Sequence, residues 1–100
     1  MNSNAHPILT ELSRQLPESS CLYQYIHEPS DFETIAEQAQ RDMACLENLE
    51  GNHEDGRSAK AVLEENGYQE WLKNSDSDEQ LRVLGTLRLI ADLSEDLAED

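Results

Sequence analysis

Basic and aromatic side chains are both scarce in this sequence. The 100 residues include seven Lys and Arg and five aromatics against 22 Asp and Glu, so the formal net charge is −15. A chain this acidic repels phosphate, which disfavours direct binding to nucleic acid. The length and the mostly aliphatic composition predict one acidic helical domain over residues 1–100, in which residues 1–6 are expected to be a flexible lead-in.

Long apolar runs are also absent. No stretch of about 18 apolar residues occurs, so neither a membrane span nor binding to a membrane is expected. The first residues contain no Lys or Arg and no apolar segment, so no signal peptide is predicted. A cytoplasmic protein is therefore the default expectation. The two cysteines, Cys21 and Cys45, lie 24 residues apart without a CxxC motif. In that compartment they are expected to be reduced and partly buried.

The motifs that carry catalysis or hold a metal are missing. The three histidines, His6, His27 and His53, form no HExxH pattern, and there is neither a Gly-rich phosphate loop nor a GxSxG motif. The segment from Asp76 resembles the start of a calcium loop, but its twelfth position is Leu87 rather than Glu. We therefore expect no catalytic residue, no metal site and no cofactor, and a protein that is not an enzyme.

Helical periodicity predicts an all-α fold, a compact single-domain bundle of about five or six helices. The clearest helix covers residues 31–50, with a capping box that begins at Ser30 and a left-handed cap at Gly51. Its apolar stripe consists of Phe32, Ile35, Ala36, Ala39, Met43, Leu46 and Leu49. Its outward face is predicted to carry Glu33, Glu37, Glu47 and, further round, Asp42.

The last helix is predicted to be long, starting from a second capping box at Ser77. Between residues 81 and 97 its apolar positions cover well over half the circumference, so it should be largely buried in the fold or shared with a second subunit. The 78–97 helix is therefore a candidate homodimer interface. Gly85 inside it costs about 1 kcal/mol relative to Ala, which indicates a close approach of another backbone.

Two shorter patterns are ambiguous. Residues 21–26 and 81–90 also alternate as strands do, so an α+β fold with strands at these positions is the alternative. Residues 58–74 have a helix–turn–helix outline with a break at Gly67. Because its second helix contains one Lys, two packed helices with Trp71 in the core are favoured over DNA recognition.

The negative charge is clustered in two parts of the chain. Residues 28–55 contain nine acidic residues and one basic one, and residues 89–100 contain five acidic residues and none that is basic. In the second cluster the carboxylates follow i, i+3, i+4 and i+7 spacing, so they share a helix face, repel one another and oppose the helix dipole. The predicted partner-binding residues are Glu33, Glu37, Glu47, Asp92, Glu95, Asp96 and Glu99.

A clustered negative surface suits a basic partner. We expect a non-enzymatic inhibitor or decoy that binds the basic nucleic-acid-binding surface of another protein, such as a nuclease or a nucleic-acid-binding complex. In composition and size the chain resembles phage-encoded anti-defence proteins, the anti-CRISPR and anti-restriction DNA mimics. The alternative is an acidic protein-interaction module, such as an antitoxin, nuclease-immunity protein, chaperone or regulatory adapter, in which the apolar surface of the last helix supplies affinity.

Overall fold

The computed structural model describes residues 7–28, 30–49, 51, 56 and 58–99. The flexible lead-in predicted for residues 1–6 lies outside them. All elements that the described residues form are helical, so the prediction of a compact all-α bundle is confirmed, and both segments considered as strands are helices. In chain order the elements are α1 (Pro7–Ser13), α2 (Cys21–His27), α3 (Phe32–Glu47), α4 (Ala59–Leu63), the kinked connection η1 (Glu64–Tyr68), α5 (Gln69–Asn74) and α6 (Ser77–Glu99).

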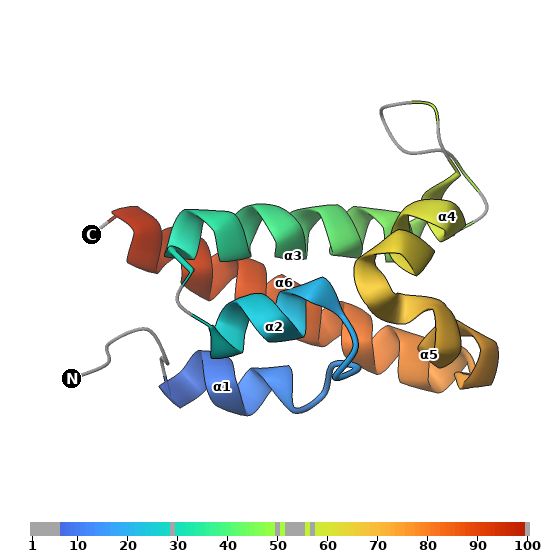
Figure 1. Cartoon of the computed structure of the whole chain (residues 1–100), viewed down its shortest axis with the longest axis horizontal. Coiled ribbons are helices and arrows are strands. Elements are labelled where there is room, and N and C mark those ends of the chain that lie inside the picture. The colour runs from blue at the N-terminus through green and yellow to red at the C-terminus, as the bar shows by residue number, and fades with distance from the viewer. Residues whose placement is uncertain (1–6, 29, 50, 52–55, 57, 100) are drawn as a thin grey trace.

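The two long helices, α3 and α6, form the frame of the molecule. They lie side by side and run in opposite directions, so the start of α3 is next to the end of α6 (Figure 1). Helices α1 and α2 pack against this pair and against each other, while α4 packs against α3 and continues through η1 into α5. The radius of gyration, 13.0 Å, is the value expected for a compact chain of this length.

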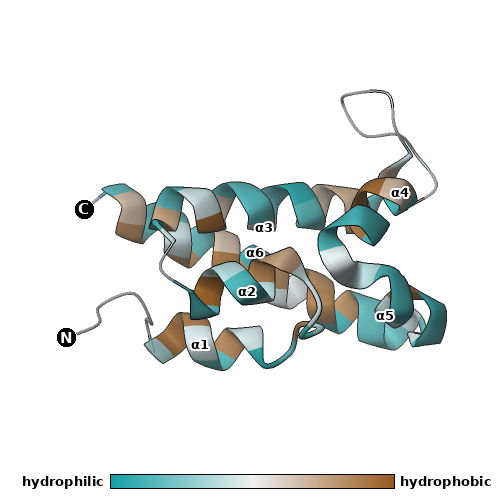
Figure 2. Ribbon diagram, viewed as in Figure 1, coloured by the Kyte–Doolittle hydropathy of each residue, from teal (hydrophilic) through white to brown (hydrophobic). Residues whose placement is uncertain are grey.

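A mostly aliphatic core lies between the helices. Each long helix contributes one face to it, and the ribbon coloured by hydropathy alternates between apolar and polar residues along both helices, as amphipathic helices do (Figure 2). Among the residues that the structure describes, Tyr68 is the only aromatic one whose side chain is fully buried. The least exposed leucines and isoleucines of the described residues are Leu9, Leu22, Ile26, Ile35, Leu63, Leu87 and Ile90.

Both long helices start at an aspartate instead of the predicted serine. The Asp31 carboxylate accepts a hydrogen bond of 3.0 Å from the backbone N–H three residues later, and Asp76 accepts one of 2.9 Å in the same way. The predicted caps, Ser30 and Ser77, are each displaced by one residue. A carboxylate caps a helix as well as a hydroxyl does, and it also interacts favourably with the positive end of the helix dipole. This explains why aspartate and not serine is the N-cap of both helices.

The predicted left-handed cap at Gly51 is wrong. Helix α3 ends earlier, at Glu47, with Asn48 as its C-cap. The glycines with positive φ among the described residues are Gly56 and Gly67, not Gly51. A side chain at Gly51 would collide with the Asn48 side chain, so this glycine is accounted for by lack of space and not by its backbone conformation.

The predicted break at Gly67 is confirmed and has a structural consequence. Gly67 has a φ of 94°, and its carbonyl accepts a 2.6 Å hydrogen bond from the Ser19 hydroxyl. The turn directs Tyr68 into the core, where it is 0% exposed. Trp71, which was expected in the core, packs at its edge and donates a 2.9 Å hydrogen bond to Glu79. The central aromatic is thus Tyr68.

Helix α6 is buried on one side and exposed on the other. Val83 and Leu87 face the core, whereas Leu81 and Leu89 are 66% and 56% exposed. A Cβ atom at Gly85 would meet nothing within 4 Å. The close backbone approach predicted at Gly85 is therefore not made within the described part of this chain.

The two helical-region glycines should respond oppositely to alanine. Gly67→Ala should destabilise the protein by at least about 2 kcal/mol, because Ala disfavours positive φ and its Cβ would collide with the Ser19 backbone. Gly85→Ala should stabilise it by up to about 1 kcal/mol, because the position is an open, exposed site inside a helix. Urea unfolding of both variants measures this. Equal effects at the two positions would contradict the described environments.

Candidate protein-binding surface

Four of the seven predicted partner-binding residues line a single groove. Glu33 and Glu37 come from the first half of α3, and Glu95 and Glu99 from the end of α6. The groove has a volume of about 300 Å³ and is completed by Ala36, Gln40 and Ala98. We call it the acidic groove. None of the described residues that line it is basic.

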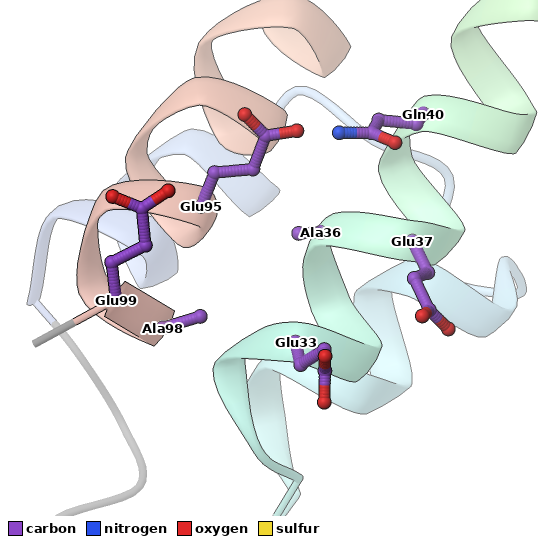
Figure 3. Close-up of a pocket in the computed structure, with 7 residues that line it drawn as sticks. All are labelled: Glu33, Ala36, Glu37, Gln40, Glu95, Ala98 and Glu99. Atoms are coloured by element: carbon purple, nitrogen blue, oxygen red, sulfur yellow. The ribbon is translucent and has the colours of Figure 1, made fainter.

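Small side chains between the two helices create the acidic groove. Ala36 and Ala98 lie where the helices face each other, and their short side chains leave a hollow that larger residues would fill (Figure 3). Across it the Glu95 carboxylate and the Gln40 amide turn toward one another, whereas the Glu37 carboxylate extends away from α6. All four glutamates of the groove are exposed to solvent.

The other three predicted residues lie outside the acidic groove. Asp92 and Asp96 are exposed on α6 and do not line it. Glu47 lies at the opposite end of α3, where its carboxylate is 3.9 Å from Arg88 Nη2 of α6. Both partners of this ion pair are well exposed, so it contributes little to stability. The seven residues therefore form one groove and separate flanking positions.

Asp42, predicted on the outward face of α3, is instead fully buried. Its carboxylate accepts a 2.7 Å hydrogen bond from the Tyr68 hydroxyl and a 2.8 Å hydrogen bond from the Gln38 amide. Tyr68 belongs to η1, so the first bond ties α3 to the turn that follows α4. The assignment of Asp42 to the acidic surface was wrong, and its role is internal.

Burial also changes the acidity of this pair. Removal from water raises the pKa of Asp42 from 3.8 to about 6, although the hydrogen bonds from Tyr68 and Gln38 lower it. Burial and the neighbouring Asp42 charge raise the pKa of the Tyr68 hydroxyl well above its usual value. Asp42 also raises the pKa of the half-buried Cys21 thiol, after the larger effect of burial.

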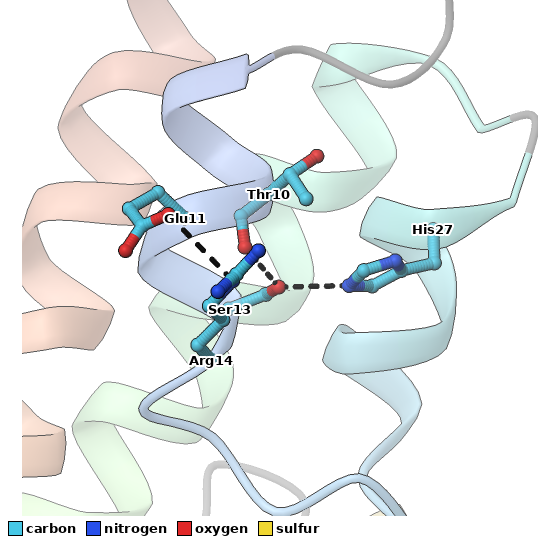
Figure 4. Close-up of polar contacts among 5 residues, drawn as sticks. All are labelled: Thr10, Glu11, Ser13, Arg14 and His27. Atoms are coloured by element: carbon cyan, nitrogen blue, oxygen red, sulfur yellow. Dashed lines mark hydrogen bonds and ion pairs between the residues drawn. The ribbon is translucent and has the colours of Figure 1, made fainter.

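A serine–histidine contact that the sequence analysis missed joins α1 to α2 (Figure 4). The Ser13 hydroxyl donates a 2.6 Å hydrogen bond to the Thr10 carbonyl and lies 2.8 Å from His27 Nε2. Since its single proton is directed to Thr10, Ser13 accepts from His27, the reverse of a nucleophile activated by a base. Ser13 is also 0% exposed, and His27 stacks on Tyr23. The contact clamps two helices together.

The described residues contain no group of three or more His, Cys, Asp or Glu side chains placed to hold a metal ion. Within the same residues, no helix has both the length and the apolar character needed to cross a membrane. Cys21 and Cys45 are free cysteines; Cys21 is half-buried, as predicted, whereas Cys45 is buried more completely than predicted.

Comparison of the chain with protein-family models, with curated proteins and with solved structures finds no match.

Asp42 should make stability fall as the pH rises. Its pKa rises from 3.8 to about 6 on folding, so the protonated carboxyl group contributes stability that is fully present below about pH 4. This contribution, about 3 kcal/mol in all, is lost progressively as the pH rises from about 4 through 6. In Asp42→Asn this loss should disappear, because an amide does not titrate. The variant should still fold, because Asn can accept a hydrogen bond from Tyr68 and donate one to a rotated Gln38 amide. In urea unfolding, the stability of wild type should fall by about 1 kcal/mol more than that of Asp42→Asn between pH 5 and pH 7.

Asp31→Asn provides the control with the opposite sign. Hydrogen bonds from Thr34 lower the pKa of Asp31, so its contribution to stability is present at neutral pH and lost as the pH falls. A difference between wild type and Asp42→Asn that is constant across the pH range would contradict the buried, protonatable carboxyl group.

Proposed function

We propose that this protein is a non-enzymatic inhibitor that binds the basic nucleic-acid-binding surface of another protein and thereby occupies the place of nucleic acid. The observation that supports the proposal most directly is the acidic groove. Two helices from the two acidic parts of the chain bring four exposed carboxylates to one concave site, and no described cation lines it. We place this role in the cytoplasm, with a nuclease or nucleic-acid-binding complex as the partner class.

The spacing of the carboxylates supports this choice of partner. Along each helix the groove residues are four positions apart, about 6 Å of helix axis. Two such rows side by side give about one charge per 3 Å, close to the phosphate spacing of one DNA strand, about 3.4 Å. A Lys- or Arg-lined surface that accepts a phosphate backbone could therefore accept these carboxylates.

The position of the charges on α6 supports it as well. Glu95 and Glu99 lie in the last two turns of α6, and no basic residue lies in its last turn to compensate the helix dipole. Negative charge there is unfavourable in the free protein and would be relieved by a cationic partner. With a net charge of −15, the chain would also attract such a partner over about a Debye length, roughly 8 Å at physiological salt.

A charge-matched pair of variants tests the acidic groove. The groove variant replaces Glu33, Glu37, Glu95 and Glu99 with Gln, and the control variant replaces the exposed Glu18, Glu28, Glu70 and Asp78 with their amides. Both lose four negative charges. Immobilised wild type should capture nucleic-acid-binding proteins from a bacterial lysate at low salt, and duplex DNA should displace them. The control variant should behave similarly, and the groove variant should capture at least about tenfold less, because rows of charge-assisted contacts are lost.

Two outcomes would count against the proposal. Equal capture by the groove and control variants would show that net charge acts without the groove. Capture that is insensitive to both salt and DNA would favour the alternative class, an interaction module held mainly by apolar contacts.

A further inference from the structure

A second hollow lies at the opposite end of the boundary between α3 and α6. Its volume is about 350 Å³, and it is lined by the end of α3 and the beginning of α6. We call it the apolar hollow. The residues that line it are Leu46, Glu47, Ser77, Gln80, Leu81 and Leu84.

The apolar hollow contains the most exposed large apolar side chain that the structure describes. Leu81 is 66% exposed, although it lines a concavity whose wall includes Leu46, which is almost fully buried. An exposed leucine alone would be ordinary, but an exposed leucine beside an open, partly apolar concavity is the arrangement that accepts a side chain from another molecule. The volume lies at the lower end of the range for ligand sites, which suits one side chain of a larger partner.

The apolar hollow and the acidic groove are separate sites lined by the same two helices. Helices α3 and α6 run in opposite directions (Figure 1). The groove therefore lies at the end marked by Glu33 and Glu99, and the hollow at the end marked by Glu47 and Leu81. The Glu47–Arg88 ion pair joins the two helices near the hollow. A segment lying along this boundary could therefore reach both sites.

We propose that the apolar hollow binds one aliphatic or aromatic side chain of the same basic segment whose Lys and Arg residues occupy the acidic groove. The inference rests on the proposed function and adds the second determinant of the partner: an amphipathic basic segment with an apolar anchor at one end. The carboxylates supply steering and selectivity for cations, and burial of Leu81 against the anchor supplies affinity that salt does not screen.

Charge complementarity disfavours a second copy of this chain as the occupant. If two α6 helices crossed antiparallel at the open Gly85, Arg82 of one copy would lie opposite Arg88 of the other, and Asp78 opposite Asp92. In a parallel pair each acidic position would face itself. Like charges meet in either arrangement, and the two molecules would also carry −15 each. A basic segment of another protein is instead attracted by the net charge of −15.

A synthetic peptide tests the inference directly. The probe is an amphipathic helical peptide with lysines along one face and a single tryptophan at one end, and the matched probe has alanine in place of tryptophan. Fluorescence anisotropy should show that wild type binds the tryptophan peptide about tenfold more tightly, as expected when one aromatic side chain is buried. Leu81→Ala should abolish this preference without changing the dependence of affinity on salt.

Leu89→Ala is the matched control, because Leu89 is 56% exposed on the same helix but does not line the apolar hollow. It should retain the tryptophan preference. Equal affinity of wild type for both peptides, or equal effects of Leu81→Ala and Leu89→Ala, would overturn the inference. So would Leu81-dependent dimerisation in analytical ultracentrifugation, which would assign the surface to a second copy.

Failure of the proposed function would look different. If the groove variant bound both peptides as tightly as wild type, and salt did not weaken the binding, the acidic groove would not be the cation-binding site. If wild type bound both peptides equally but salt still weakened the binding, only the proposed apolar anchor would be wrong, and the proposed function would stand.

Discussion

The packing of α3 against α6 is the contact on which the rest of the structure depends. It is the most extensive contact between any two helices of the described chain, and both candidate binding sites lie along it. The acidic chain repels itself, so the fold requires apolar burial to offset that repulsion. Buried side chains such as Ile35 on α3 and Leu87 and Ile90 on α6 provide it, while the opposite faces of the same helices carry the carboxylates.

A second constraint connects the backbone at Gly67 to the interior of the bundle. The positive φ of Gly67 lets the chain pass close to Ser19 and turns Tyr68 inward. Only then can the Tyr68 hydroxyl reach Asp42 on α3. Burial raises the pKa of this carboxyl group, and the hydrogen bonds from Tyr68 and Gln38, which lower it, offset only part of that effect.

The sequence predicted the helices well because their signals are local. Apolar spacing and helix caps placed α3 and α6 within a few residues, and the errors at Ser30, Ser77 and Gly51 reflect caps that are chemically equivalent or decided by nearby side chains. Asp42 could have been recognised, since it follows Ile35 by seven residues and therefore lies on the apolar face of the helix. Its partner could not, because nothing local pairs Asp42 with Tyr68.

The sequence could predict which carboxylates each helix exposes, but not that they line one groove. Each helix pattern places its own carboxylates on one exposed face, but the alignment of Glu33 with Glu99 depends on how α3 and α6 pack. That alignment depends on the fit of side chains in the shared core, which neither helix contains by itself. The apolar hollow was missed for the same reason: Leu81 belonged to a continuous apolar pattern, and only the packing shows that this leucine remains exposed.

The end of α6 shows how the fold retains an unfavourable charge arrangement. Asp92, Glu95, Asp96 and Glu99 repel one another near the negative end of the helix dipole, and in an isolated peptide this would favour fraying. Here Leu93 and Leu97 pack against the core between them, so the last turns remain helical and the carboxylates are held on the opposite side. Because tertiary packing maintains the helix, the repulsion stays uncompensated in the free protein. These four carboxylates are therefore already held in place in the free protein, and under the proposed function a cationic partner would not have to order them on binding.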